Sequence, residues 1–195
     1  MTVVNALEAK NLFKVFGRNP KNAVSRLKAG QSRADVVDAG TAAVIDASFT
    51  VQRGEIFVIM GLSGSGKSTI IRMLNGLLEP TAGEVIVQGQ NVTKASAAEL
   101  RAIRRASVSM VFQHFALLPH RTVIDNAAYA LEVQGVAKPE RLRRAAEILE
   151  KVGLGDRADA FPDELSGGMR QRVGLARALT AGTDILLMDE AFSAL

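Results

Sequence analysis

Short apolar segments alternate with longer amphipathic ones along this chain, and each pattern predicts an element. Residues 45–51 carry an apolar side chain at every second position, which is typical of a half-buried strand. Residues 56–60 and 185–188 are continuous apolar runs, which are typical of strands covered on both faces of a sheet. Residues 139–152 repeat apolar positions every three or four residues, so they predict a helix with one face in the core.

The rest of the chain continues this alternation of strands and helices. The patterns predict further strands at residues 6–16, 84–87 and 108–112, and helices at residues 20–29, 32–39, 67–77, 97–105, 122–133 and 167–181. This order indicates an α/β fold with a largely parallel sheet. The segment 17–40 differs from its surroundings, because it is rich in Lys, Arg, Ala, Asp, Gly and Ser.

Composition excludes several kinds of site. The chain of 195 residues has no cysteine, which excludes disulfides, thiolate catalysis and Cys-ligated zinc. His114 and His120 are too few for a metal site built from imidazoles, and we interpret both as surface or packing residues. No apolar run approaches the ~20 residues that a membrane helix needs, and residues 1–10 lack a secretory pattern. The net charge of +4 is spread along the chain, so we expect no nucleic-acid partner.

A glycine-rich segment between a predicted strand and a predicted helix is typical of a phosphate-binding loop. Residues 61–69 read GLSGSGKST and match the pattern G-x-x-x-x-G-K-[ST] in full. Glycines let the backbone N–H groups converge on phosphates, and the helix N-terminus adds partial positive charge. Lys67 supplies a full charge to the β- and γ-phosphates of ATP, and the Ser68 hydroxyl is placed for Mg²⁺. The predicted contacts are Gly61, Ser63, Gly64, Ser65, Gly66, Lys67, Ser68 and Thr69. The alternative is a glycine-rich turn with a chance lysine.

Two acids end the last apolar run. Asp189 and Glu190 follow residues 185–188, and unpaired carboxylates are costly at the end of a buried strand. At the carboxyl end of a parallel sheet they can face a ligand instead. Asp189 is predicted to hold Mg²⁺, and Glu190 is predicted to polarise the attacking water as general base. The alternative is a solvated Asp-Glu turn.

Residues 165–171 read LSGGMRQ, and this signature segment resembles that of ATP-binding-cassette (ABC) ATPases. A serine that caps a helix and two glycines in its first turn make a second open helix end. In the resembled family two chains pair head to tail, and each signature closes on the ATP of the other chain. The resemblance therefore implies nucleotide contacts at Ser166, Gly167, Gly168 and Gln171. The alternative is a simple N-cap, which does not explain glycines that cost about 1 kcal/mol each in a helix.

Other positions also match the resembled family. Gln113 is similar to the glutamine that contacts Mg²⁺ and the attacking water, and its alternative is a polar residue that ends a strand. Phe16 resembles the aromatic residue that stacks on adenine, and its alternative is a core phenylalanine. The apolar cluster at Phe115, Leu117, Leu118 and Pro119 resembles the region that meets membrane subunits, and its alternative is an ordinary contribution to the core.

The resemblance is strongest to the ATPase subunits of glycine betaine/proline importers, over segments 54–60, 110–119, 162–172 and 184–195. It implies an ATPase that powers import of a quaternary amine or proline-type osmolyte. The implied partners are a second ATPase chain, membrane permease subunits and, indirectly, a substrate-binding protein. The implied location is peripheral, on the cytoplasmic face of the cell membrane.

The resemblance also implies a domain plan. We expect a P-loop NTPase fold with a mostly parallel sheet, an antiparallel β part and a helical subdomain. A single nucleotide-binding domain would comprise an ATP-binding core at residues 1–94 and 166–195, a helical subdomain at 95–165 and an insertion at 17–40. It would be C-terminally incomplete, because the D-loop aspartate and the switch histidine of the family would follow residue 195. A chain lacking both is expected to be inactive alone.

Three alternatives to an osmolyte importer remain open. The chain could serve another ABC transporter, or a non-transport ABC ATPase of DNA repair or translation, although no long insertion of the kind those carry is present. It could also be a binding-only remnant. A P-loop kinase or GTPase is disfavoured, because the signature segment has no role there.

Overall fold

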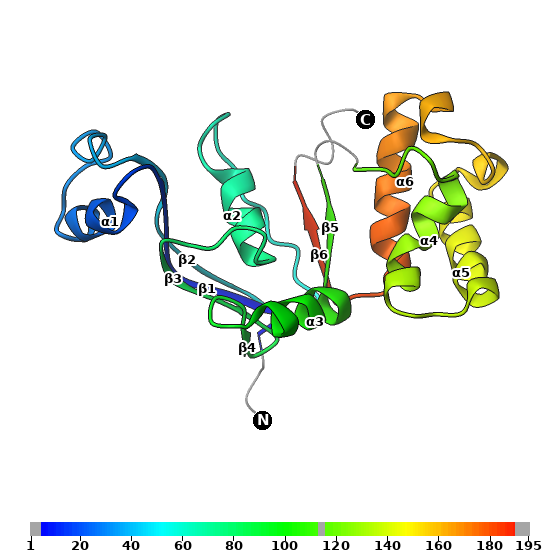
Figure 1. The fold of residues 1–195 in the computed structure, drawn as a ribbon, viewed down its shortest axis with the longest axis horizontal. Coiled ribbons are helices and arrows are strands. Elements are labelled where there is room, and N and C mark those ends of the chain that lie inside the picture. Colours follow the sequence, from blue (N-terminus) through cyan, green and yellow to red (C-terminus); the bar gives the residue numbers. More distant parts are fainter. Residues whose placement is uncertain (1–4, 113–115, 190–195) are drawn as a thin grey trace. The chain divides into compact units, whose positions relative to one another are not determined.

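The computed structural model describes residues 5–112 and 116–189. The chain divides into two compact units, Met1–Ile103 and Arg104–Leu195. Each unit has its own sheet and its own helices, coloured in chain order in Figure 1. We therefore describe the two units one after the other.

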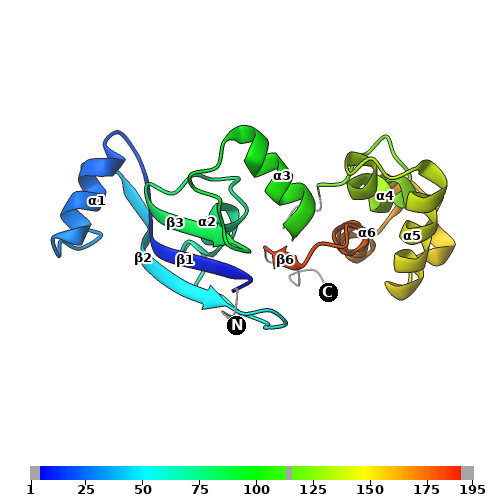
Figure 2. The ribbon, with the colours of Figure 1, turned by 90° about the horizontal axis from the view of Figure 1, so that it is seen from below.

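The first unit is built on a four-stranded antiparallel sheet. Its strands are β1 (Leu7–Phe16), β2 (Thr41–Val51), β3 (Ala82–Val87) and β4 (Gln90–Asn91), in the order β2-β1-β3-β4. Figure 2 shows β1 between β2 and β3. Besides a helix between β1 and β2, this unit contains α2 (Lys67–Leu74) and most of α3 (Ala97–Ser107), which runs across the boundary between the units.

The segment between β1 and β2 forms a small core of its own. It contains α1 (Pro20–Lys28), which Asn19 caps by accepting a hydrogen bond from the Asn22 N–H. The buried residues of this core are Phe13, Val15, Ala23, Val24, Leu27, Val36, Ala39 and Ala42. These residues come from β1, from β2 and from the segment between them. The segment therefore packs against the end of the sheet where β1 ends and β2 begins.

The predicted helix at residues 32–39 is wrong, because the structure has turns there. The Asp35 carboxylate accepts hydrogen bonds from the Ser32 N–H and hydroxyl, at 2.8 and 2.7 Å. Both Asp38 carboxylate oxygens accept from Arg26 Nη1, at 2.8 and 2.9 Å. Short polar side chains of this kind compete with helical hydrogen bonds for the backbone. Residues 32–39 therefore form turns that side-chain hydrogen bonds stabilise, although their sequence pattern resembles that of a helix.

The predicted buried strand at residues 56–60 is also wrong. The segment is irregular, and Ile56 and Met60 are 91% and 87% exposed. A strand of a parallel sheet needs a hydrogen-bonded neighbour. Among the described residues of the first unit, every strand pairing is antiparallel and none involves this segment. Its one aromatic side chain, Phe57, instead stacks on Phe49 with 4.8 Å between ring centroids.

The second unit combines a short parallel strand pair with a helical layer. Strands β5 (Val108–Val111) and β6 (Ile185–Met188) run parallel in register. The helices are α4 (Val123–Val133), α5 (Lys138–Lys151) and α6 (Gly167–Thr180), with short 3-10 turns at Gly155–Arg157 and Pro162–Glu164. Their shared core comprises Val123, Ala127, Ala128, Ala145, Leu149, Leu154, Leu165, Val173 and Ala176. Each buried leucine there contributes about 1.5–3 kcal/mol.

The other predicted elements are present, with ends shifted by a few residues. The structure thus combines parallel and antiparallel strands with a helical part, as expected. The proportion of parallel strands is lower than expected, because the described residues include four antiparallel strands and only two parallel ones. No helix within the described ranges is both long and apolar enough to cross a membrane.

Candidate nucleotide-binding site

The phosphate-loop segment lies between residues 56–60 and the start of α2. Residues 61–65 are exposed, and Gly66 is the N-cap residue of α2 with φ of +96°. A Cβ atom built on Gly66 would lie 2.4 Å from the carbonyl oxygen of Ala43 on β2. Both the left-handed backbone and the close approach require glycine here. The final glycine of the motif therefore fixes the helix start against the sheet.

The N-terminus of α2 is open. No side chain caps it, so its first N–H groups remain available to an acceptor. A helix end of this kind carries partial positive charge and is suited to an anion. An exposed loop followed by an uncapped helix end is the arrangement that the predicted phosphate cradle requires.

Lys67 bends back over its own loop. Its Nζ donates hydrogen bonds to the carbonyl oxygens of Gly61 and Leu62, at 3.0 and 2.9 Å. The ammonium group is thus held at the loop without a carboxylate partner in these contacts. A phosphate in the loop would offer that ammonium a charged acceptor in place of two neutral ones. Ser68 and Thr69, which follow in α2, are half-buried.

Phe16 lies at the same end of the sheet as the phosphate loop. It pairs with Thr41, and Ala43, which abuts Gly66, is two residues further along β2. Two residues of strand span roughly 7 Å. Phe16 is 46% exposed, so it is not a core residue of the first unit. A partly exposed aromatic side chain near the predicted phosphate loop suits stacking on a purine.

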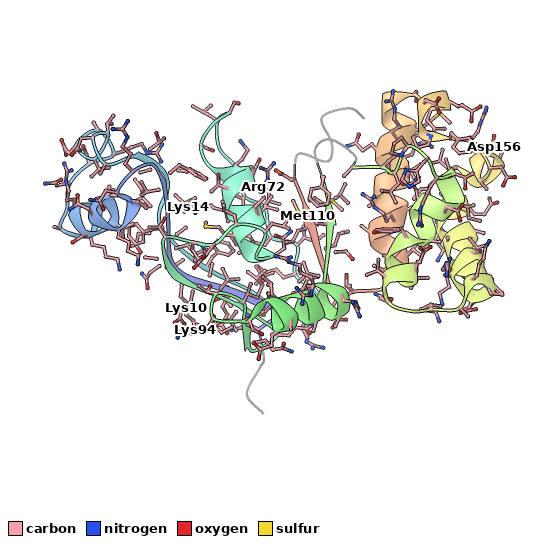
Figure 3. All side chains as sticks on the ribbon, viewed as in Figure 1. Lys10, Lys14, Arg72, Lys94, Met110 and Asp156 are labelled. Atoms are coloured by element: carbon pink, nitrogen blue, oxygen red, sulfur yellow. The ribbon has the colours of Figure 1, made fainter. Side chains whose placement is uncertain are left out.

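Lys14 is a residue of this corner that the sequence analysis missed. Its Nζ lies 5.2 Å from the centroid of the Phe16 ring and donates to the Glu79 carbonyl oxygen at 2.7 Å (Figure 3). The two residues are two apart on one strand, and residues with that spacing share a face. This spacing is the signal that could have revealed the pair.

Asp189 lies at the carboxyl end of the parallel strand pair. Val111 and Met188 are register partners, and the Asp189 N–H donates to the Val111 carbonyl oxygen at 3.1 Å. The Asp189 side chain is 1% exposed. The predicted residues Gln113 and Glu190 lie outside the described residues, as does Phe115. The chain connects Gln113 to β5 and Glu190 to β6, so both follow the ends of paired strands.

The predicted Mg²⁺ ligands are oxygen donors. Mg²⁺ takes one or two protein oxygens and completes its shell with water and substrate phosphates. The Ser68 hydroxyl and the Asp189 carboxylate fit this chemistry. Across residues 5–112 and 116–189, no cluster of three or more His, Cys, Asp or Glu could hold a metal by itself.

The signature segment begins α6 in the second unit. The exposed Ser166 is the N-cap, and its Oγ accepts a hydrogen bond from the Met169 N–H at 3.3 Å. A Cβ atom on Gly167 would meet nothing within 4 Å, so packing inside the chain does not require glycine there. The Leu165 and Gln171 side chains are buried, whereas Ser166 is exposed and residues 167–170 are half-buried.

Comparison with known proteins assigns the family. Residues 44–193 match the family model described as ABC transporter. The match covers well over half of the chain, which therefore belongs to the ABC transporter family.

Several curated relatives carry names of a narrower group. The chain is 56% identical over 191 residues to the glycine betaine/proline betaine transport system ATP-binding protein ProV of Salmonella typhimurium. It is 54% identical over 191 residues to the glycine betaine transport ATP-binding protein OpuAA of Bacillus subtilis. Each alignment covers 97% of this chain but 48% and 46% of the relative. The chain thus spans about half the length of the curated relatives it matches.

A solved relative confirms the fold. The ATP-binding cassette MJ0796, in a dimeric post-hydrolysis state bound to ADP and Pi, matches with a TM-score of 0.83 and 32% sequence identity. The match covers 97% of this chain and 75% of that chain. The predicted fold class, that of a P-loop ABC ATPase, is confirmed.

Proposed function

We propose that this chain is the nucleotide-binding part of an ATPase subunit that powers import of an osmolyte, such as glycine betaine or proline, through an ABC transporter. The observation that carries the proposal is the phosphate cradle, in which an uncapped helix end is fixed against β2 at Gly66. The names of the curated relatives support the transport role and the class of cargo.

ATP is the proposed ligand of the cradle. Residues 61–69 would hold its phosphates through backbone N–H groups, and Lys67 would release its two carbonyl contacts to bind phosphate. Phe16 would stack on the adenine. Ser68, Gln113 and Asp189 would hold Mg²⁺, which neutralises phosphate charge when it is bound.

Hydrolysis requires an activated water and stabilised charge on the γ-phosphate. Glu190 is proposed to accept the proton of the attacking water, and Lys67 is proposed to stabilise the developing charge. A second chain in a head-to-tail pair would present its signature segment to the same phosphate, with Ser166, Gly167 and Gly168 as the accessible contacts. Gln171 belongs to the same predicted set of contacts, but its side chain is buried within α6. The dimeric solved relative supports such pairing.

The cargo would not touch this chain. Permease subunits would bind this chain on the cytoplasmic face of the membrane, and a substrate-binding protein would deliver the osmolyte to the permease subunits. The methionine import ATP-binding protein MetN of Rhizobium johnstonii is 54% identical over 157 residues, which is why sequence similarity alone supports the transport role more firmly than the cargo. Co-purification of this chain with a permease subunit would test the transport role. The cargo that the resulting transporter accepts would test the class of cargo. We retain the domain plan of an ATP-binding core, a helical subdomain and an insertion as part of the proposal.

Replacing Lys67 tests the nucleotide site. Lys67→Ala removes the charge that faces phosphate and leaves the loop backbone in place, so tight binding of a fluorescent ATP analogue should be lost. The matched control is Lys94→Ala, because Lys94 is an exposed lysine of the same unit that pairs with Glu84 (Figure 3). Equal affinity in the parent, the control and Lys67→Ala would contradict the proposed site.

A further inference from the structure

A fully buried asparagine in the second unit has no part in the site described above. Asn126 lies at the start of α4 with 0% of its surface exposed. Its Oδ1 accepts a hydrogen bond from the Leu118 N–H at 2.8 Å. Its Nδ2 lies 3.0 Å from each of three carbonyl oxygens, those of Leu118, Arg121 and Thr122. One side-chain amide therefore closes the loop 116–122 onto α4.

These contacts define what Asn126 does in the core. A buried amide is costly unless its donors and its acceptor are paired. The Leu118 and Thr122 carbonyl oxygens also accept backbone N–H groups, those of Arg121 and Asn126. An apolar residue at this position would fill the space but would remove the side-chain partner of the Leu118 N–H and of the Arg121 carbonyl oxygen. Asn126 thus specifies one conformation of the loop.

The other end of the loop is attached to α6. Arg177, in the third turn of α6, donates a hydrogen bond from Nη1 to the Ala116 carbonyl oxygen at 2.7 Å. Ala116 has φ of +46°, a conformation that residues with a side chain adopt rarely. The loop is therefore held at its beginning by α6 and at its end by α4.

The start of α4 also holds the segment that leads into the signature. The Val123 N–H donates to the Ala160 carbonyl oxygen at 2.8 Å, and the Ile124 N–H donates to the Ala158 carbonyl oxygen at 2.9 Å. This segment continues through the turn Pro162–Glu164 to Ser166, the N-cap of α6. Hydrogen bonds thus connect the loop 116–122 to the start of α4, and the start of α4 to the segment that leads into α6.

We propose that Asn126 is a positioning residue that joins the loop 116–122 and the Ser166 end of α6 into one rigid piece. The loop begins three residues after Gln113, so a nucleotide or a membrane partner that displaces the loop would displace the signature segment as well. The functional consequence rests on the proposed function, in which Gln113 and the signature segment both serve ATP. The rigid connection itself does not depend on ATP.

The connection can be measured by spin labelling, because the chain has no native cysteine. Labels at Pro119→Cys in the loop and Asp163→Cys before the signature should give one narrow distance distribution in the parent chain. Asn126→Ser should broaden it and should accelerate hydrogen exchange of the Leu118 amide roughly tenfold or more, since several hydrogen bonds are lost. Exchange in the core of α5 should change much less.

The matched control is Thr180→Val. Thr180 is buried in the same unit, and its hydroxyl donates to the Ala176 carbonyl oxygen of its own helix at 2.7 Å. This variant removes a buried hydrogen bond without touching the loop, so the label distribution should stay narrow. Asn126→Asp is the second test variant, because it keeps an acceptor for Leu118 but places oxygen opposite three carbonyls. It should broaden the distribution too.

Three outcomes overturn the proposal. The first is a narrow distribution in both Asn126 variants, and the second is a distribution in Thr180→Val as broad as that of the Asn126 variants. The third is loss of the helical fold, by circular dichroism, in both Asn126 variants, which would make the residue a determinant of folding rather than of position. Nucleotide titration of the parent chain separates this result from the proposed function. Failure to bind ATP overturns that function and leaves the distance measurement valid.

Discussion

At the scale of the residue, Gly66 and Asn126 show two ways in which one position controls a loop. Gly66 has no side chain, and its left-handed backbone brings the helix start against Ala43 on β2. Asn126 has a side chain that replaces backbone hydrogen bonds for a loop without regular structure. The glycine was predicted from the motif, because a short local pattern specifies it. The asparagine was not, because its partners precede it in a loop with no sequence pattern.

Gly66 and Gly64 form a matched pair for a test. Gly64 also has a left-handed backbone, with φ of +75°, but a Cβ atom there would meet nothing within 4 Å. Gly64→Ala should cost about 1–2 kcal/mol in free energy of unfolding, for the backbone conformation alone. Gly66→Ala adds the clash with Ala43, so it should cost more and should abolish binding of a fluorescent ATP analogue. Thermal unfolding and nucleotide titration measure both effects. Equal costs in the two variants would show that the contact with β2 does not constrain the loop.

At the scale of the element, secondary-structure predictions were right where an apolar pattern repeated over many residues. They were wrong where contacts outside the pattern determined the structure. The 14-residue helix α5 was predicted from its apolar face, and it buries Ala145 and Leu149 in the core of the second unit. The predicted helix at 32–39 became turns, because Asp35 and Asp38 bind nearby donors through their side chains. Helix propensity and apolar periodicity can predict a helix, but they do not reveal such side-chain hydrogen bonds.

Helix α5 also makes a prediction about pH. The Glu140 carboxylate accepts hydrogen bonds from Arg143 and Arg144, which lower its pKa from the usual 4.5 to about 2. A lowered pKa in the folded state means that the contribution to stability is full above pH 4.5 and is lost as the pH falls through about 2. Glu140→Gln should therefore lower Tm slightly at pH 7, and the difference from the parent should vanish near pH 2.

The control for this helix is Glu147→Gln, which removes a carboxylate that pairs with Arg143 on the same exposed face. Its effect on Tm at pH 7 should be smaller, because one arginine rather than two is released. A Glu140→Gln difference that persisted unchanged at pH 2 would show that packing, not charge, stabilises this part of α5.

At the scale of the whole molecule, the first unit does not itself cover an apolar segment where a strand was predicted. Residues 56–60 match a buried strand in composition, yet Ile56 and Met60 are almost fully exposed. Monomeric proteins rarely expose contiguous apolar patches of this kind, and such patches favour association. The family assignment does not depend on this segment being paired, since the matches extend over most of the chain.

This exposure has a measurable consequence. The double variant Ile56→Thr and Met60→Thr should bind less of an apolar fluorescent dye than the parent chain and should remain monomeric at higher concentration. Val133→Thr is the control, because Val133 is an exposed apolar residue at the end of α4, in the second unit. Equal dye binding in the parent and the double variant would show that residues 56–60 are covered in solution.

The sequence by itself determined the phosphate loop, the signature segment, most element positions and the fold class. All of these depend on short local patterns, in which backbone freedom, periodicity and capping act over a few residues. Only the tertiary structure decided that Gly66 abuts Ala43, that Phe16 is exposed at the same corner, and that Asn126 and Arg177 hold the loop 116–122. The contacts of Gly66 with Ala43 and of Arg177 with Ala116 join residues far apart in sequence, so they exist only once the strands and helices have packed. The contacts of Asn126 are closer in sequence, but they depend on how the loop folds back onto the start of α4.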